Sequence, residues 1–241
     1  MQKDRIFFDK EPNKGSFKFS NEVADVFPDM LKRSIPNYSK TIETIEFLTK
    51  EFIQPNTNCY DLGCSLGKAS LAMHNGINVN GCQIYAIDKS KSMTEKFKQN
   101  IKESNLTAPI NILNDDILDI KIKNASIIVM NYTLQFLKEE DRQRMINKIF
   151  DGLNRKGLFL LSEKIKIQNK KVNNVLDQLH YDFKLKNKYS QLEISRKRDA
   201  IENVLIRDEL YTHEKRLSRA GFKDFGIWMQ HFNFVSYIAI K

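Results

Sequence analysis

The chain has 241 residues and a mass of 28.2 kDa, so at roughly 150 residues per domain it has room for one α/β domain with additions. With 41% hydrophobic and 29% charged residues, nine glycines and five prolines, its composition excludes collagen-like, low-complexity and wholly disordered chains. No apolar run approaches the roughly 18 residues that a membrane span requires, and residues 1–15 lack the apolar block of a secretory signal. We therefore expect a cytoplasmic protein with no membrane partner.

The formal net charge is +9, and most of the basic excess lies between Lys164 and Lys223. This excess suggests an anionic partner, but it fits a solvated helical face as well as a nucleic-acid surface. The reason is that net charge attracts anions in general and does not identify a specific partner. The cysteines Cys59, Cys64 and Cys82 are too few for a disulfide framework, and neither they nor the four scattered histidines have metal-ligand spacing. We expect core thiols and no metal site.

The first elements in chain order are helices between Val23 and Phe52, with predicted interruptions at Pro28 and Pro36. The second of these helices should begin near Ser39. Its three- and four-residue spacing of apolar side chains predicts burial of Ile42, Ile45, Leu48 and Phe52.

The centre of the chain alternates short β-rich runs with helical patterns, which is typical of a parallel sheet covered on both faces. Strands are predicted at Cys59–Leu62, Gln83–Asp88, Ile110–Leu113, Ala125–Met130 and Gly157–Ser162. Helices are predicted at Ala69–Met73, Lys91–Glu103 and Glu139–Leu153. The last of these helices carries a buried stripe formed by Met145, Ile146, Ile149, Phe150 and Leu153.

More helix follows between Val172 and Leu210, and two apolar runs, Phe225–Met229 and Phe234–Ile240, predict a hairpin at the sheet edge. Five alternating β/α units followed by two adjacent strands describe an α/β, Rossmann-like class I methyltransferase fold with a seven-stranded, mostly parallel sheet. We expect a single domain over residues 1–241. Its parts are an N-terminal helical lid (1–54), a Rossmann core (55–163), a helical insertion (164–220) and a C-terminal strand pair (221–241).

The sharpest motif is the segment from Tyr60 to Gly67, which follows a strand and opens a helix. It fits the D-x-G-x-x-x-G pattern of S-adenosylmethionine enzymes and not the G-x-G-x-x-G of nicotinamide enzymes, because residue 65 is Ser. Glycine at 63 and 67 lets the main chain turn tightly and lie against a ligand. Any sharp turn between strand and helix also favours glycine, so a purely structural role stays open.

Polar side chains follow the next strands. Asp88 ends the second strand, where a carboxylate can accept two hydrogen bonds from a ribose diol, and Asp116 follows the third, where it can receive an adenine amino group. Asn131 follows the fourth, facing the position of a reactive sulfonium. These strand ends meet in one crevice, which favours adenosyl binding over a bare structural domain. Helix capping remains an alternative for Asp88, and a capping amide for Asn131.

The helix after Tyr189 gives a further signal. Ser190 and Glu193 form a capping box, which phases the helix and places Arg198 on an apolar stripe. Ile194, Ile201 and Leu205 form that stripe. A guanidinium there needs an anion to compensate its desolvation, unless it extends its stem along the stripe and keeps its head in water. By the same phasing, Arg196 and Lys197 are expected to be solvated.

Segments along nearly the whole chain resemble the carboxy-S-adenosyl-L-methionine synthase family. The resemblance is carried by Val23–Met30, Tyr60–Gly67, Thr133–Leu137, Leu161–Lys164, the Glu193–Arg198 helix and Trp228–Phe234. It implies conversion of S-adenosylmethionine and prephenate into carboxy-S-adenosylmethionine and phenylpyruvate, with no protein base. A partner tRNA carboxymethyltransferase then uses the product for 5-oxyacetyl modification of a wobble uridine. The chain also lacks the Asn-Pro-Pro-Tyr segment of amino-methylating enzymes.

The resemblance also implies a site for S-adenosylmethionine, carboxy-S-adenosylmethionine or S-adenosylhomocysteine. Gly63, Cys64 and Ser65 would line the methionine part. Asp88 and Lys89 would hold the ribose, Asp116 and Ile117 the adenine, and Asn131 would face the region near the sulfur. Tyr38 would close the site, and Arg198, the one catalytic residue, would pair with the new carboxylate. Because the family usually has Asn where this chain has Lys89, only a backbone contact is expected there.

The resemblance further implies a homodimer, with the basic helical insertion near the subunit contact. Two alternatives stay open. One is a conventional S-adenosylmethionine-dependent methyltransferase, and the other is a non-catalytic module that binds S-adenosylmethionine and tRNA. Whether tRNA is contacted directly is left open.

Overall fold

A seven-stranded sheet forms the centre of the molecule, as predicted. The computed structural model describes residues 2–9, 16–201 and 204–241. The strand order is β3-β2-β1-β4-β5-β7-β6, in which β7 runs antiparallel to both β5 and β6 and the other pairs are parallel. The strands are β1 (Asn58–Leu62), β2 (Gln83–Ile87), β3 (Ile110–Leu113), β4 (Ala125–Asn131), β5 (Leu153–Lys164), β6 (Asp224–His231) and β7 (Phe234–Ile240).

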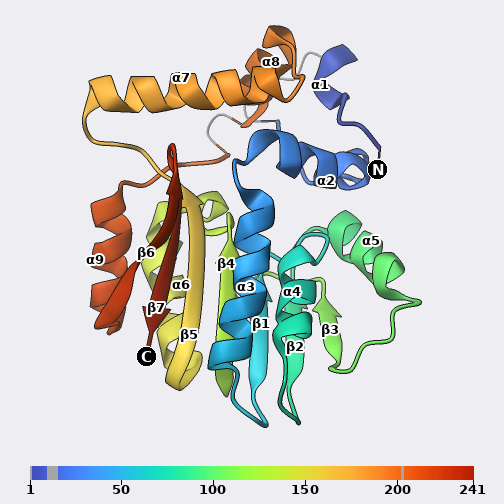
Figure 1. Ribbon diagram of the computed structural model, residues 1–241, viewed down its shortest axis with the longest axis vertical. Coiled ribbons are helices and arrows are strands. Elements are labelled where there is room, and N and C mark those ends of the chain that lie inside the picture. Colours follow the sequence, from blue (N-terminus) through green and yellow to red (C-terminus); the bar gives the residue numbers. More distant parts are fainter. Residues whose placement is uncertain (1, 10–15, 202–203) are drawn as a thin grey trace.

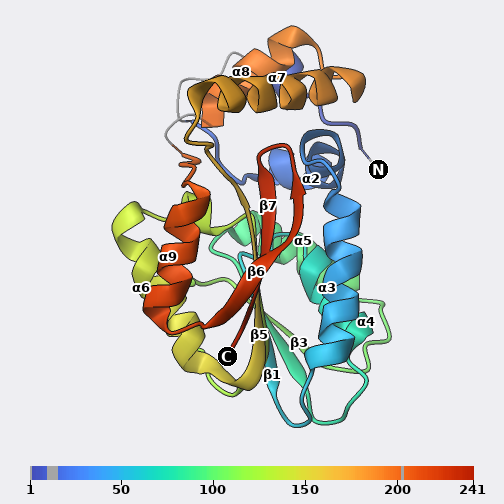
Figure 2. The same ribbon diagram turned by 60° about the vertical axis from the view of Figure 1, so that its left-hand side comes forward.

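Helices cover both faces of the sheet (Figures 1 and 2). On one face lie α3 (Tyr38–Phe52), α4 (Lys68–Gly76) and α5 (Lys91–Ile101). On the other lie α6 (Glu139–Gly152) and α9 (Leu210–Ala220), which also pack against each other. The two apolar layers exclude water from β1 and β4, and every residue of β1 is buried.

Each covering helix packs on the sheet through one apolar face. In α6, Met145, Ile146 and Ile149 are fully buried against the sheet, as their spacing predicted. In α3, Ile45 is buried while Ile42, Leu48 and Phe52 pack against the same core from its margin. The three cysteines are buried free thiols, which confirms the prediction of core thiols.

Two predictions about the connections are wrong. Pro28 lies inside α2 (Asn21–Ser34) and does not interrupt it, whereas the chain does break at Pro36, between α2 and α3. A proline inside a helix costs about 3 kcal/mol. Burial of the α2 side chains Val23, Val26 and Met30 offsets that cost. In addition, residues 114–124, which connect β3 to β4, contain no helix. One of the five predicted β/α units therefore lacks its helix.

The carboxyl ends of the parallel strands are covered by a separate group of helices (Figure 1). These are α1 (Ile6–Asp9), α2, α7 (Lys170–Lys186) and α8 (Gln191–Ile201). The segments expected as lid and insertion are thus mixed in position: α3 and α9 pack on the sheet, and the other helices lie over its edge. No helix in the described ranges has the length and hydrophobicity of a membrane span.

Candidate active site

The turn between β1 and α4 has three residues in the left-handed region: Gly63 at φ 83°, Ser65 at 50° and Gly67 at 78°. A Cβ on Gly63 would lie 2.3 Å from Oγ1 of Thr133, and one on Gly67 would lie 2.0 Å from the Phe97 ring. Both glycines are therefore required by packing as well as by turn conformation. The glycine pattern alone does not distinguish a ligand site from a tight structural turn.

Asp88 follows β2 and anchors this turn. Its Oδ2 accepts from the Ser65 N–H (2.9 Å), and its Oδ1 accepts from the Ser90 N–H (2.8 Å). Burial raises the pKa of the Asp88 carboxyl, an effect that the two backbone donors and Lys89 oppose. Each carboxylate oxygen has a second lone pair, so Asp88 keeps acceptor capacity for hydroxyl groups. Ser90 caps α5 with its own Oγ, so capping does not require the Asp88 side chain.

The residues after β3 adjoin Asp88. The Asn114 side-chain amide donates to the Asp88 carbonyl (3.0 Å), which joins the ends of β3 and β2. Asp116 closes a local turn, because its Oδ1 accepts from the Leu118 N–H (2.9 Å). Ile117 is buried in the core. The structure thus brings the expected ribose and adenine residues to adjacent strand ends.

Buried polar atoms lie at the end of β4. The Asn131 Oδ1 is buried and has no hydrogen bond to the described residues, and the buried Tyr132 hydroxyl lies beside the Thr41 side chain. Tyr132 has a positive φ of 59°. Burial of an unpaired polar atom costs about 1–3 kcal/mol. A polar ligand at this strand end would supply the missing partner of Asn131.

Tyr38 and Asp61 lie beside these atoms. Tyr38 begins α3, and burial, followed by the charge of Asp61, raises the pKa of its phenol. Asp61 accepts from the Ser70 hydroxyl (2.6 Å), and burial raises the pKa of the Asp61 carboxyl to about 7. The end of β1, the N-terminus of α3 and the end of β4 therefore bring buried polar groups close together.

Two of the expected residues differ in burial, and only the Cys64 side chain is withdrawn from a ligand by packing. The Cys64 side chain packs into the apolar cluster with Ala86 and Phe97, and burial raises the pKa of its thiol. Lys89 is exposed. The residues at the strand ends nevertheless fit an adenosyl sulfonium, because Asp88 offers acceptors and Asn131 offers an unpartnered polar atom in a buried position.

The prediction for the buried face of α8 is wrong, although its capping box is confirmed. The Ser190 N–H donates to Oε2 of Glu193 (2.7 Å), and the Glu193 N–H donates to Oγ of Ser190 (3.2 Å). Arg198, however, is 75% exposed and 3.8 Å from Asp199, whereas Glu193, Ile194 and Ala200 are buried.

The two basic residues expected to be solvated are engaged. Arg196 donates to the Phe8 carbonyl (2.6 Å), and Lys197 donates to Oγ of Ser34 (2.9 Å). The reason is that α8 packs against α1, which turns Arg198 outward.

Comparisons with known proteins agree with this geometry. A family model described as a methyltransferase domain matches residues 60–157. A solved structure from Methanococcus maripaludis, described as an S-adenosyl-L-methionine-dependent methyltransferase, is 22% identical with a TM-score of 0.61 and covers 93% of this chain and 94% of its own. Magnesium protoporphyrin IX methyltransferase from Synechocystis with bound SAH is 16% identical with a TM-score of 0.62, covering 98% and 92%. The fold is that of a class I S-adenosyl-L-methionine-dependent methyltransferase.

Sequence relatives give the family. A carboxy-S-adenosyl-L-methionine synthase from Yersinia enterocolitica is 46% identical over 100% of this chain and 90% of its own length. A Yersinia pestis protein of the same name is 45% identical with the same coverage. The chain belongs to the carboxy-S-adenosyl-L-methionine synthase family and is a transferase that uses S-adenosyl-L-methionine.

Proposed function

We propose that this chain converts S-adenosyl-L-methionine and prephenate into carboxy-S-adenosyl-L-methionine, phenylpyruvate and water. The observation that carries the proposal is the full-length likeness to relatives named for the carboxylated product. A cytoplasmic tRNA carboxymethyltransferase would consume that product in 5-oxyacetyl modification of wobble uridine. Prephenate suits the reaction, because it can release both carbon dioxide and a hydroxyl group as its ring becomes aromatic.

The reaction balances without an added oxidant or base. Prephenate loses its ring carboxylate as carbon dioxide and its ring hydroxyl, which leaves as water with a proton from the donor methyl group. When bound, S-adenosyl-L-methionine supplies a methyl carbon that the adjacent sulfonium makes acidic, and this carbon forms the new bond to carbon dioxide. Phenylpyruvate carries away the remaining carbons.

The protein's contribution is to bind and orient. We propose that Asp88 accepts from the ribose hydroxyls, that Asp116 and Ile117 hold the adenine, and that the backbone from Gly63 to Ser65 lines the methionine part. The Asn131 amide oxygen, which is buried without a partner, would face the region of the sulfur. Tyr38 would close the site over Asp61 and exclude water, so that carbon dioxide is not lost before it is captured.

The proposal is tested by incubating the purified protein with S-adenosyl-L-methionine and prephenate and weighing the cofactor by mass spectrometry. We expect a species heavier by one carbon dioxide, and none when prephenate is omitted. A methylated acceptor formed without prephenate would instead identify a conventional methyltransferase. Salt-dependent tRNA binding without turnover would identify a binding module.

Arg198 is proposed to pair with the carboxylate of the product. It is exposed on α8, and Asp199 at 3.8 Å is a weak competitor for its guanidinium. We expect Arg198→Ala to reduce the preference for carboxy-S-adenosyl-L-methionine over S-adenosyl-L-methionine by roughly tenfold, the lower end of the range for a charged hydrogen bond, because solvent screens the pair. Calorimetric titration with each compound measures this ratio. The matched control is Arg219→Ala, another exposed arginine, which should leave the ratio unchanged.

We propose a homodimer in which α7 and α8 face the second copy. The α7 side chains Val172, Val175 and Leu179 are 47%, 57% and 41% exposed and share one helix face, and Leu192 of α8 is 55% exposed. Contiguous exposed apolar residues of this kind mark association surfaces. In sedimentation at micromolar concentration, we expect a dimer for the wild type and for Phe47→Glu, an exposed control on α3, and a monomer for Val175→Glu. A wild-type monomer would refute the proposal.

A further inference from the structure

Three lysines gather beside the site, at the carboxyl end of β5 and under α7 and α8. Lys164 is the last residue of β5, Lys184 lies near the end of α7, and Lys197 lies in α8. All three are partly exposed, and the imidazole of His180 experiences the charge of each. We refer to Lys164, Lys184 and Lys197 as the lysine cluster.

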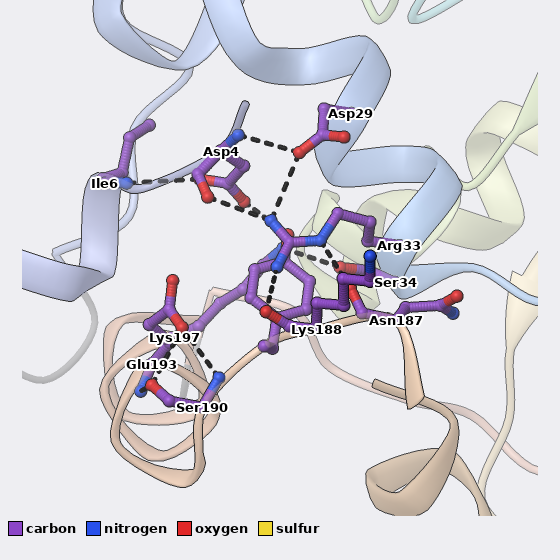
Figure 3. Close-up of polar contacts among 11 residues, drawn as sticks. Asp4, Ile6, Asp29, Arg33, Ser34, Asn187, Lys188, Ser190, Glu193 and Lys197 are labelled. Carbon is purple, nitrogen blue, oxygen red and sulfur yellow. Dashed lines mark hydrogen bonds and ion pairs between the residues drawn. The ribbon is translucent and has the colours of Figure 1, made fainter. Parts of the chain in front are cut away.

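Contacts of α2 fix Lys197 and the segment that follows α7 (Figure 3). Arg33, which is 7% exposed in α2, donates to the carbonyls of Asn187 and Lys188 just after α7, both at 2.7 Å. Lys197 donates from Nζ to Oγ of Ser34, the residue after Arg33 (2.9 Å). The segment after α7 and the middle of α8 therefore both contact α2. These contacts of Arg33 and Ser34 position Lys184 and Lys197.

His180 gives the cluster no opposite charge. Its Nε2 donates to the Ser34 carbonyl (2.8 Å), so its Nδ1 is left as the acceptor for Nζ of Lys164 (3.2 Å). Burial, and then the nearby lysines, hold the pKa of the imidazole far below its usual value. His180 is neutral at physiological pH.

Carboxylates are also scarce. Among residues 2–9, 16–201 and 204–241, no carboxylate oxygen lies within 4.0 Å of an ammonium group of the cluster. Asp177 is near enough to raise the pKa of Lys164 and Lys184, but its Oδ1 is engaged by Arg207 and by the Asn233 amide, both at 2.8 Å. Asp4 and Asp29 likewise raise the pKa of Lys197, but the Asp4 carboxylate accepts from the Tyr189 hydroxyl and Asp29 pairs with Arg33 (3.2 Å). All three carboxylates are already engaged, so none is a dedicated counter-ion for the cluster.

This imbalance weakens the charged form of each lysine. Burial is the main cause that lowers the pKa of Lys164 and of Lys197 to about 7 and that of Lys184 to about 8. Neighbouring cations add to this effect, whereas Asp4 and Asp29 oppose it at Lys197 and Asp177 opposes it at Lys164 and Lys184. Like charges withdrawn from water are unfavourable unless an anion compensates them. A ligand with negative groups would provide that compensation.

The cluster lies next to the end of β4. Residue 131 of β4 pairs with residue 162 of β5, so Lys164 is two residues beyond that level on the neighbouring strand. The centre of the Phe234 ring lies 5.5 Å from Nζ of Lys164 and 5.9 Å from the centre of the Tyr132 ring, so both neighbour the same aromatic side chain. An anion on Lys164 would therefore lie near the end of β4.

We propose that Lys164, Lys184 and Lys197 bind the carboxylates of the second substrate, a small dicarboxylic acid, and so select it over uncharged molecules. The assignment rests on the proposed function in naming prephenate as that acid. Two carboxylates would pair with two of the three lysines, and the Phe234 and Tyr132 rings offer an apolar wall for the body of the molecule.

The test is Lys184→Met, because Lys184 has no hydrogen bond to the described residues and methionine keeps much of its apolar stem. We expect the KM for prephenate to rise about tenfold or more, as for loss of a charged hydrogen bond, while the Kd for S-adenosyl-L-methionine changes less than about twofold. Lys184→Arg should restore most of the loss. Lys186→Met, an exposed lysine on the same helix, is the matched control.

Two further measurements keep the site and the reaction separate. Malonate and inorganic phosphate are titrated by calorimetry into wild type, Lys184→Met and the double variant Lys184→Met/Lys197→Met. We expect malonate to bind the wild type more tightly than phosphate and to lose about tenfold in affinity with the first substitution. Unchanged KM and unchanged malonate binding in the double variant would overturn the proposal even if the wild type makes carboxylated product. Malonate binding that the substitutions abolish, in an enzyme inactive with prephenate, would uphold the anion site and reject the proposed reaction.

Discussion

Replacing Asp88 by Asn should weaken binding of S-adenosyl-L-methionine by about 10- to 100-fold. Both carboxylate oxygens already accept from backbone N–H groups, of Ser65 and Ser90, so the ribose would use the remaining lone pairs. An amide has one acceptor oxygen, and its NH₂ group would oppose a backbone donor. Charged hydrogen bonds of this kind contribute about 1.5–3 kcal/mol each. Calorimetric titration of the purified protein measures the change.

The same substitution should leave the fold intact. Burial raises the pKa of the Asp88 carboxyl above its unfolded value, so the charged form is disfavoured in the ligand-free fold, and stability from this group grows as pH falls. A neutral amide removes the cost of burying a charged carboxylate, although it loses the hydrogen bond from one of the two backbone N–H groups. The control is Asp119→Asn, because Asp119 is an exposed carboxylate in the segment that follows β3. This variant should bind S-adenosyl-L-methionine normally. Normal binding by Asp88→Asn would remove Asp88 from the site.

Arg142→Met should lower the free energy of unfolding by about 3–5 kcal/mol. The Arg142 side chain is fully buried and donates to Asp208 (2.5 Å) and to the carbonyls of Gln135 (3.2 Å) and Leu137 (3.0 Å). Its loss would remove a buried donor from each of these acceptors. Asp208 would keep Arg216 (2.5 Å) and the Gln135 carbonyl would keep the Ile206 N–H (3.0 Å). The substitution would also leave Glu163, whose pKa burial raises to about 8 and Arg142 lowers, without its nearby cation.

Chemical denaturation followed by circular dichroism measures this loss. Arg144→Met is the matched control on the same helix, because Arg144 is 65% exposed and pairs with Asp141 at the surface (3.0 Å), an interaction that contributes less than about 1 kcal/mol. A loss below about 1 kcal/mol for Arg142→Met would show that the buried pair is not needed. Because Arg142 holds the residues that follow Asn131, the variant should also bind S-adenosyl-L-methionine less tightly.

The sheet and its strand ends could be predicted because their signals are local. Strands buried on both faces, such as Ala125–Asn131, are continuous apolar runs, and the polar residues that follow them lie at one edge wherever the strands are parallel. The capping box at Ser190 is local too, and the structure contains it. These features depend on residues a few positions apart.

The wrong predictions concern contacts between distant segments. The buried face of α8 depends on α1, so Arg198 lies outward although its helix was phased correctly from the cap. Pro28 is tolerated because α2 packs against residues far along the chain. The lysine cluster joins β5, α7 and α8, and its only sequence signal is the basic excess after Lys164, which solvated helices would also give. Tyr132 could have been noticed only as the neighbour of Asn131.

The central claim is that this protein moves the carboxyl group of prephenate to the methyl carbon of S-adenosyl-L-methionine. Prephenate carrying carbon-13 in its ring carboxylate tests this most directly, with unlabelled bicarbonate present and the cofactor weighed by mass spectrometry. We expect a cofactor heavier by one labelled carbon dioxide, because a site closed by Tyr38 would capture carbon dioxide before it exchanges with solvent. A cofactor that gains unlabelled carbon dioxide, or gains none while prephenate is consumed, would contradict the claim.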